Sequence, residues 1–175
     1  MKSTNRFLMM AFALFCLPAL ALAQGAASNL VLLKVNDSET ALEYNANGSS
    51  HGRCVSGSEP GCVRVSGNGS ITFRLVNDRS CASGARWELT GVQLGGENSG
   101  GKPGAFGGLS SQAASDFNAD AGSGWANTSP SSGSAITMSD ANRAAYSLWY
   151  RVRASCSGSP DIWFDPRIEN EGTGR

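Results

Sequence analysis

Residues 144–156 read AAYSLWYRVRASC and, after the turn cluster SGSP, residues 161–168 read DIWFDPRI. In the first segment an apolar residue occupies every second position from Tyr146 onward. Because successive side chains of a strand point to opposite faces, this alternation predicts a strand with one buried face. The second segment supplies the returning strand of a β-hairpin. Pro166 has no N–H group to donate, so this last strand is expected to lie at a sheet edge or to end there.

Four short motifs accompany this hairpin in the sequence. They are RWELTG at 86–91, DAN at 140–142, LWYRV at 148–152 and DPRIEN at 165–170. Their order resembles the pattern of the DP-EP family of uncharacterised bacterial proteins, in scattered pieces over roughly the second half of the chain. The resemblance implies a β-sandwich and carries no assigned activity.

The N-terminus has the three parts of a secretory signal peptide. Lys2 and Arg6 precede an apolar run over residues 7–22, and small residues occupy the −3 and −1 positions of a cut after Ala23. The apolar run is short for a membrane span and no second one follows it, so we expect no transmembrane segment. The sequence therefore predicts a bacterial protein that is periplasmic or secreted, with residues 24–175 forming a single domain.

Composition argues against one class of partner. Removal of the signal peptide, which holds two basic residues, leaves twelve Lys and Arg against fourteen Asp and Glu, a net charge of −2. Nucleic-acid binding requires a basic surface, so no nucleic-acid partner is expected. Charged residues make up 16% of the chain, below the roughly 25% of ordinary domains, while Gly is abundant. This balance suits an exported all-β protein with long loops.

Four cysteines remain after the predicted cleavage: Cys54, Cys62, Cys81 and Cys156. An even number of cysteines in an exported chain indicates disulfide bonds. Four cysteines allow three pairings, and the sequence alone does not choose among them. We favour Cys54–Cys62, which closes a short loop, together with Cys81–Cys156, which ties an early connection to the C-terminal hairpin.

Several further segments have the length and pattern of strands. Apolar or alternating stretches occupy residues 29–35, 62–65, 70–76, 86–94 and 135–138. The Asn-Gly pair at 68–69 lies between the second and third of these stretches and predicts a hairpin. Gly91 breaks the alternation of its stretch and predicts a β-bulge. The total of about seven or eight strands predicts an all-β, immunoglobulin-like antiparallel β-sandwich.

Residues 95–134 form a long stretch rich in Gly, Ser, Ala and Asn. So many residues without regular structure are unusual inside a compact domain. Four large apolar side chains are spaced through the stretch: Phe106, Leu109, Phe117 and Trp125. Pure linkers lack such anchors, so we expect a long excursion pinned to the body of the protein at these points, with one helical turn at 110–116.

Two groups of residues are candidates for binding a partner. Trp149, Arg151 and Arg153 occupy positions of the first hairpin strand that face away from the apolar set. Aromatic and Arg side chains together are typical of protein interfaces and of sugar-stacking surfaces. Phe117 and Trp125 are candidate recognition tips, since binding residues are often carried on loops. An exposed Trp149 would favour a protein partner, and a groove around Trp125 would favour a small ligand.

Asp116, Asn118 and Asp120 place oxygen atoms at alternate positions, as calcium-binding loops do. The EF-hand pattern next requires Gly and, six residues further, an acid, whereas this chain has Ala121 and Asn127. A looser Ca²⁺ site is therefore the alternative to a plain polar turn, and no other cofactor is expected.

Catalytic chemistry has little support in the sequence. His51 is the single histidine and lies between small residues, which favours a solvated loop side chain over a catalytic base. We therefore expect a non-catalytic binding or structural protein whose partner is a protein or glycan of the cell envelope. A calcium- or carbohydrate-binding module is the alternative. A hydrolase that uses Asp161 and Asp165 as a carboxylate pair is a more distant one.

Overall fold

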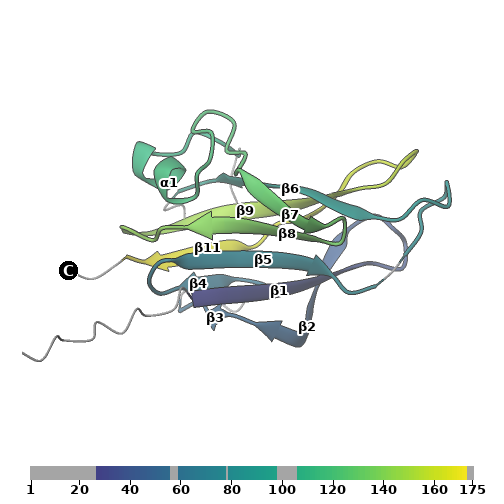
Figure 1. The fold of residues 1–175 in the computed structure, drawn as a ribbon, viewed down its shortest axis with the longest axis horizontal. Coiled ribbons are helices and arrows are strands. Elements are labelled where there is room, and N and C mark those ends of the chain that lie inside the picture. The colour runs from purple at the N-terminus through teal and green to yellow at the C-terminus, as the bar shows by residue number, and fades with distance from the viewer. Residues whose placement is uncertain (1–26, 56–58, 78, 98–105, 173–175) are drawn as a thin grey trace, which may run out of the picture.

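The computed structural model describes residues 27–55, 59–77, 79–97 and 106–172. The described residues form eleven β-strands and one short helix, arranged as two sheets, which confirms the predicted all-β sandwich. Figure 1 shows most strands running along the long axis of the molecule, with the helix α1 (Ser111–Asp116) at one end. The predicted signal peptide, residues 1–23, lies outside the described residues.

Each sheet combines strands that are far apart in the sequence. Sheet A has the spatial order β2 (Leu42–Ser50), β1 (Ala27–Val35), β5 (Gly69–Leu75), β8 (Ala135–Asp140) and β7 (Thr128–Ser132). Sheet B has the order β10 (Ile162–Phe164), β9 (Ala145–Ser155), β11 (Arg167–Glu171), β4 (Val63–Val65) and β3 (Gly52–Arg53), and β6 (Glu88–Gly95) also pairs with β9. Most pairs are antiparallel, as expected, but β1–β5 and β4–β11 are parallel, so both sheets are mixed. A parallel pair requires a crossover, and the chain between β1 and β5 passes through sheet B.

The predicted C-terminal hairpin is present, because β9 and β10 pair antiparallel. Phe164 lies opposite Val152 and Arg167 lies opposite Trp149, so β10 and β11 follow one continuous register along β9. Between them the Tyr150 N–H donates to the Pro166 carbonyl at 2.9 Å. The expectation that the returning strand lies at a sheet edge or ends at the proline is confirmed, because β10 stands at the end of the strand order of sheet B and stops at Phe164. Pro166 removes only its own N–H donor, and β11 continues beyond it between β9 and β4.

The prediction of a hairpin at the Asn-Gly pair at 68–69 was wrong. β4 pairs with β3 and β11 in sheet B, whereas β5 pairs with β1 and β8 in sheet A. The Asn-Gly turn therefore connects the two sheets instead of two neighbours in one sheet. Turn chemistry sets the local reversal of the chain, but the partners of each strand are set by burial on both of its sides.

The core lies between the two sheets and is centred on Phe73 of β5 and Tyr150 of β9. Both side chains are fully buried, and their ring centroids are 5.2 Å apart. The alternation predicted for β9 is confirmed, since every second side chain from Tyr146 to Ala154 is buried. Burial of each large apolar side chain contributes roughly 1.5–3 kcal/mol to the free energy of unfolding.

Both favoured disulfide pairings are confirmed: Cys54–Cys62 and Cys81–Cys156 are bonded. The first closes a separation of 8 residues between β3 and β4. The second spans 75 residues and fixes the connection that precedes β6 to the end of β9. Since β6 and β9 are already neighbours in sheet B, the second disulfide reinforces the pairing of these two strands.

The described part of the long stretch, residues 106–134, is pinned as predicted. Leu109 and Phe117 are buried, while Phe106 and Trp125 are half-buried. The predicted helical turn is α1, whose first turn is capped by Ser110, because its side chain accepts a hydrogen bond from the Ala113 N–H at 3.1 Å. The anchored excursion leads into β7, which extends sheet A.

Candidate binding face

The outward side of β9 carries two arginines. Val152 points into the core and is fully buried, so its neighbours Arg151 and Arg153 project from the opposite face of sheet B. Trp163 of β10 lies directly opposite Arg153 in the antiparallel register. Paired residues of neighbouring strands project from the same face, so Trp163 joins the two arginines there.

Aromatic rings enclose both guanidinium groups. The Arg151 guanidinium carbon lies 4.3 Å from the Phe106 ring centroid and 4.2 Å from the Trp163 ring centroid. The Arg153 guanidinium carbon lies 4.7 Å from the Trp125 ring centroid, and the Trp125 and Trp163 centroids are 6.2 Å apart. These distances lie within the range of favourable cation–π contacts. We call these five residues, Phe106, Trp125, Arg151, Arg153 and Trp163, the arginine–aromatic face.

Neighbouring side chains of β6 hold the two arginines in place. The Gln93 carbonyl oxygen accepts from Nε of Arg151 at 2.8 Å and from a terminal guanidinium nitrogen at 2.6 Å. The Gln93 amide nitrogen in turn donates to the Ser123 carbonyl at 2.6 Å, so the long loop fixes the glutamine. Nε of Arg153 donates to the Thr90 hydroxyl at 2.9 Å. The arginines are therefore fixed in orientation by hydrogen bonds as well as by stacking.

The long loop brings Trp125 to the face by pairing with the free edge of β6. The Leu94 N–H donates to the Gly124 carbonyl at 2.9 Å, and the Ala126 N–H donates to the Val92 carbonyl at 3.0 Å. The predicted bulge of β6 is confirmed between Leu89 and Gly91. A Cβ atom at Gly91 would lie only 2.7 Å from a ring carbon of Trp125, so the missing side chain makes room for the indole.

Positive charge dominates the arginine–aromatic face. The Asp161 carboxylate lies 3.8 Å from a terminal nitrogen of Arg153, an ion-pair distance longer than a hydrogen bond. Within the described ranges, no carboxylate forms an ion pair with Arg151. Two stacked cations therefore face a single carboxylate.

The structure brings together three of the five predicted binding residues: Trp125, Arg151 and Arg153. Trp149 shares their side of β9, but only 4% of it is exposed and its ring stacks under Arg167 at 5.6 Å. Phe117 is fully buried and packs against Tyr146, with ring centroids 6.4 Å apart. Neither side chain is available at the surface, because Trp149 is covered within its sheet face and Phe117 is a core residue.

Two members of the face were not predicted to bind a partner. Phe106 was expected only to anchor the loop, and Trp163 was expected only to form the returning strand. If the sequence had determined the register of the C-terminal hairpin, that is, which of its residues pair with one another, Trp163 would have been placed opposite Arg153. Seven residues separate the paired Ala154 and Ile162, so the turn cluster did not define that register.

The two acids of the predicted calcium loop are each engaged by groups outside the Asp116, Asn118 and Asp120 set. One Asp116 carboxylate oxygen pairs with Nε of Arg143 at 2.9 Å, and the other accepts from the Tyr146 hydroxyl at 2.8 Å. Asp120 bends back onto its own turn and accepts from both the backbone and the hydroxyl of Ser123 at 2.7 Å. Hydrogen bonds from Ser123 lower the pKa of Asp120. The exposed Asn118 takes a positive φ of 48°, which suits a turn residue.

A buried polar network lies near Asp116 and joins three of the residues on which the family resemblance rests. One oxygen of the Asp140 carboxylate accepts from the Asn142 N–H at 2.8 Å and from the Asn170 side-chain amide at 3.1 Å. The Asn142 side chain donates to the Val65 carbonyl at 3.0 Å. The motifs at 140–142 and 165–170 therefore converge on one structural contact that links β8, β11 and β4.

Asp140 is the most perturbed carboxyl of this network. Removal from water raises the pKa of Asp140 from its ordinary value of 3.8 to about 6, while the hydrogen bonds from Asn142 and Asn170 oppose the rise and the charge of Asp116 adds to it. Burial and the hydrogen bond to Asp116 raise the pKa of the Tyr146 hydroxyl well above its usual range. The second Asp140 oxygen and the Asn170 side-chain oxygen are buried and have no hydrogen-bond partner among the described residues.

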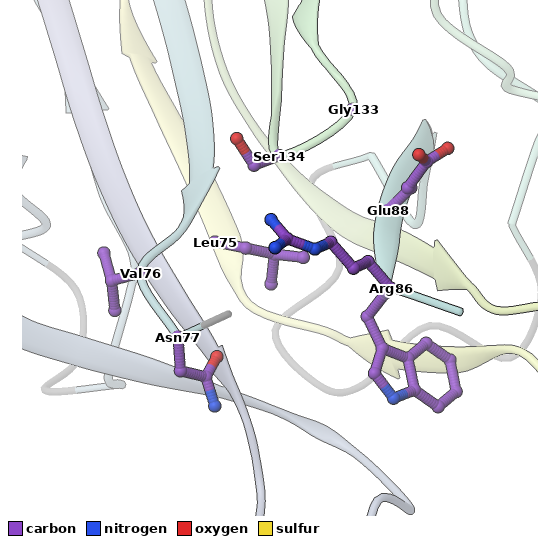
Figure 2. A pocket seen from close by; sticks show the side chains of 8 residues that line it. Leu75, Val76, Asn77, Arg86, Glu88, Gly133 and Ser134 are labelled. Atoms are coloured by element: carbon purple, nitrogen blue, oxygen red, sulfur yellow. The ribbon is translucent and has the colours of Figure 1, made fainter. Parts of the chain in front are cut away.

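A cavity of about 460 Å³ opens near the ends of β5 and β6 and the turn between β7 and β8. Figure 2 shows the Arg86 side chain extending across it toward Ser134, with Glu88 pointing away from Arg86. Asn77 also lines the cavity, but its amide is engaged by both backbone groups of Val35 at 2.9 Å. Glu88 is the one acid among the lining residues that the structure describes, and glycoside hydrolysis uses a pair of carboxylates.

His51 lines a second cavity, of about 340 Å³, beside the Cys54–Cys62 disulfide. Its Nδ1 lies 2.9 Å from the Gly52 carbonyl, which can only accept, so Nδ1 donates, and Nε2 lies 3.0 Å from the Tyr44 hydroxyl. The imidazole is half-buried and held by these two bonds, instead of being solvated in a loop as expected.

Residues 48–52 read GSSHG and match the spacing of a nucleophile elbow. That motif requires a sharp turn from a strand into a helix. Here the segment runs from the end of β2 into β3, and Ser50 pairs with Leu30 of β1. The local geometry is therefore that of a strand connection, without the helix that the elbow needs.

Comparisons with protein-family models and with curated proteins found no match to this chain. The resemblance to the DP-EP family therefore stays a prediction. The helix present in the described part of the chain, α1, is too short to cross a membrane.

Proposed function

We propose that this chain is an exported, non-catalytic binding protein of the bacterial envelope, periplasmic or secreted, that contacts its partner through the arginine–aromatic face. The observation that carries the proposal is the fixed orientation of Arg151 and Arg153 between aromatic rings. Ordered cationic and aromatic groups are the kind of surface that binding sites use, because little conformational entropy is lost when a partner binds.

Export is supported by the two disulfide bonds, which persist in oxidising compartments. The predicted signal peptide supports the same location. A non-catalytic role is supported by the partner of His51 Nδ1, which is the Gly52 carbonyl, whereas a carboxylate orients the histidine of a catalytic triad at that nitrogen. The partner is a protein or glycan of the cell envelope.

The test compares the mature chain with the double variant Arg151→Gln/Arg153→Gln in capture of envelope proteins and glycans. The matched control is Lys34→Gln/Arg74→Gln, which removes the same charge from paired strands of sheet A. We expect the arginine variant to lose most of the captured material and the control to retain it. Equal capture by all three proteins would show that the arginine–aromatic face is not the binding site.

A further inference from the structure

We infer that the ligand of the arginine–aromatic face is a carboxylate-bearing polysaccharide, an inference that rests on the binding role proposed above. The flat sides of the two guanidinium groups are occupied by Phe106, Trp125 and Trp163, which leaves their in-plane edges as the groups that bind. A guanidinium edge matches the two oxygens of a carboxylate and forms parallel hydrogen bonds with them.

Each arginine keeps N–H donors for such a ligand. A guanidinium has five N–H donors. Arg151 directs Nε and one terminal nitrogen to Gln93, and Arg153 directs Nε to Thr90. The Arg153 side chain is 32% exposed, and Arg151 is half-buried, so both groups are still accessible. The hydrogen bonds already formed hold the remaining donors in position for an incoming anion.

The two cations are also spaced along a line. Arg151 and Arg153 are two residues apart on one strand, which places their Cα atoms about 7 Å apart. Two positive charges in a row favour a ligand with negative charges on successive units over a ligand with one isolated charge. A polymer of acidic sugars has that property.

Hydroxyl groups lie next to the two arginines. The Thr90 hydroxyl lies 3.0 Å from the Ser155 hydroxyl, which donates to the Asp161 carboxylate at 2.6 Å. These groups both donate and accept hydrogen bonds, as the hydroxyls of a sugar do. The combination of charged edges, hydroxyls and half-buried rings therefore suits a polar, extended glycan.

A protein partner fits the same surface less well. Stable protein interfaces bury roughly 800 Å² on each partner around an apolar centre. The large hydrophobic side chains that are exposed among the described residues are Val55 and Val76, and neither lies on sheet B. The aromatic rings of the arginine–aromatic face are half-buried and stack on the guanidinium groups of Arg151 and Arg153. Trp149 is buried. The surface thus lacks an apolar centre.

The test measures binding of the mature chain to polygalacturonate, with its methyl-esterified form as a neutral polymer of the same backbone and poly-L-glutamate as an acidic polypeptide. We expect polygalacturonate to bind, and the affinity to fall by about tenfold or more between about 50 mM and about 500 mM salt, because ions screen the contact. Methyl esterification should abolish binding, and poly-L-glutamate should bind more weakly.

Variants locate the contact. Arg151→Gln/Arg153→Gln should weaken polygalacturonate binding by about tenfold or more, whereas Lys34→Gln/Arg74→Gln should leave it unchanged. Arg151→Lys/Arg153→Lys keeps both charges but loses the planar edges, so it should also bind less tightly. Far-UV circular dichroism and the melting transition of each variant check that it is folded.

Several outcomes would overturn the inference. Equal binding of the esterified polymer, tighter binding of poly-L-glutamate, or no binding of polygalacturonate would each show that the ligand is not an acidic glycan. In these cases the proposed function still stands if envelope capture depends on Arg151 and Arg153. If neither capture nor polymer binding changes in the arginine variants, the proposed function fails as well.

Discussion

Asp140 is a carboxyl group in the interior, and no described cation pairs with it. Its side chain is fully buried, and one of its oxygens has no hydrogen-bond partner in the part of the chain that the structure describes. An ionised group in that position costs free energy that a proton removes. Asp116, the neighbouring acid, is in contrast neutralised by Arg143. Two acids of one network therefore differ in charge balance because only one of them has a cationic partner.

The pKa of Asp140 predicts how stability changes with pH. The folded-state pKa of about 6 exceeds the ordinary 3.8, so the folded protein binds the proton more tightly than the unfolded chain does. This stabilisation is complete below about pH 4 and is lost as the pH rises through about 6, and the difference in pKa corresponds to about 3 kcal/mol at most. The substitution Asp140→Asn should remove this dependence.

The measurement is urea unfolding of the wild type and of Asp140→Asn between about pH 4 and pH 8. We expect the variant to be more stable than the wild type at neutral pH and the two to converge at the acid end. Asp120→Asn is the control, because Asp120 is exposed and its pKa is lowered, so its effect has the opposite sign. Parallel profiles for the wild type and Asp140→Asn would contradict the assignment.

At the scale of elements, β6 shows how the long loop becomes part of sheet B. One edge of β6 pairs with β9, and the other receives Gly124 and Ala126 of the loop. An uncovered strand edge can pair with another chain, so the loop protects sheet B by covering this edge. The same pairing positions Trp125 on the arginine–aromatic face. Trp125 approaches β6 closely at the bulge, where its indole occupies the space above Gly91.

The contact between Gly91 and Trp125 predicts a strong coupling between the two positions. Gly91→Ala forces the indole to move and should destabilise the protein by about 1–3 kcal/mol. In a Trp125→Ala background the same substitution should cost close to nothing, because the obstructing ring is gone. Urea unfolding of the four proteins of this cycle measures the coupling. Gly122→Ala, whose Cβ atom would meet only ordinary contacts, is the control, and additive effects at 91 and 125 would contradict the packing argument.

Elements with a local signal were predicted well from sequence, whereas among strand partners only the pairing within the C-terminal hairpin was. The alternation of β9, the bulge at Gly91 and the anchors of the long loop follow from the order of residues alone. The separation of β4 from β5 into different sheets, and the parallel pairs, depend on contacts between segments that are distant in the chain. Arg151 and Arg153 were predicted to be candidates because they alternate outward along β9, and Trp125 because it is a large side chain on a loop, whereas the burial of Trp149 and Phe117 depends on what covers them.

At the scale of the whole molecule, the two disulfides constrain the unfolded chain to different extents. Loop-closure entropy gives about 4–5 kcal/mol for the separation of 75 residues and about 2–3 kcal/mol for the separation of 8 residues. Cys81→Ser/Cys156→Ser should therefore lower the free energy of unfolding more than Cys54→Ser/Cys62→Ser does. Urea unfolding of both variants checks the order, and a larger loss from the short loop would contradict it.

The position of β11 has a consequence for biosynthesis. Residues 167–171 fill the centre of sheet B, between β9 and β4, so the sheet stays open until the ribosome has made these residues. A nascent polypeptide that lacks them exposes two unsatisfied backbone edges and has no closed core. Folding of sheet B is therefore completed only when β11 inserts between two strands that precede it in the chain.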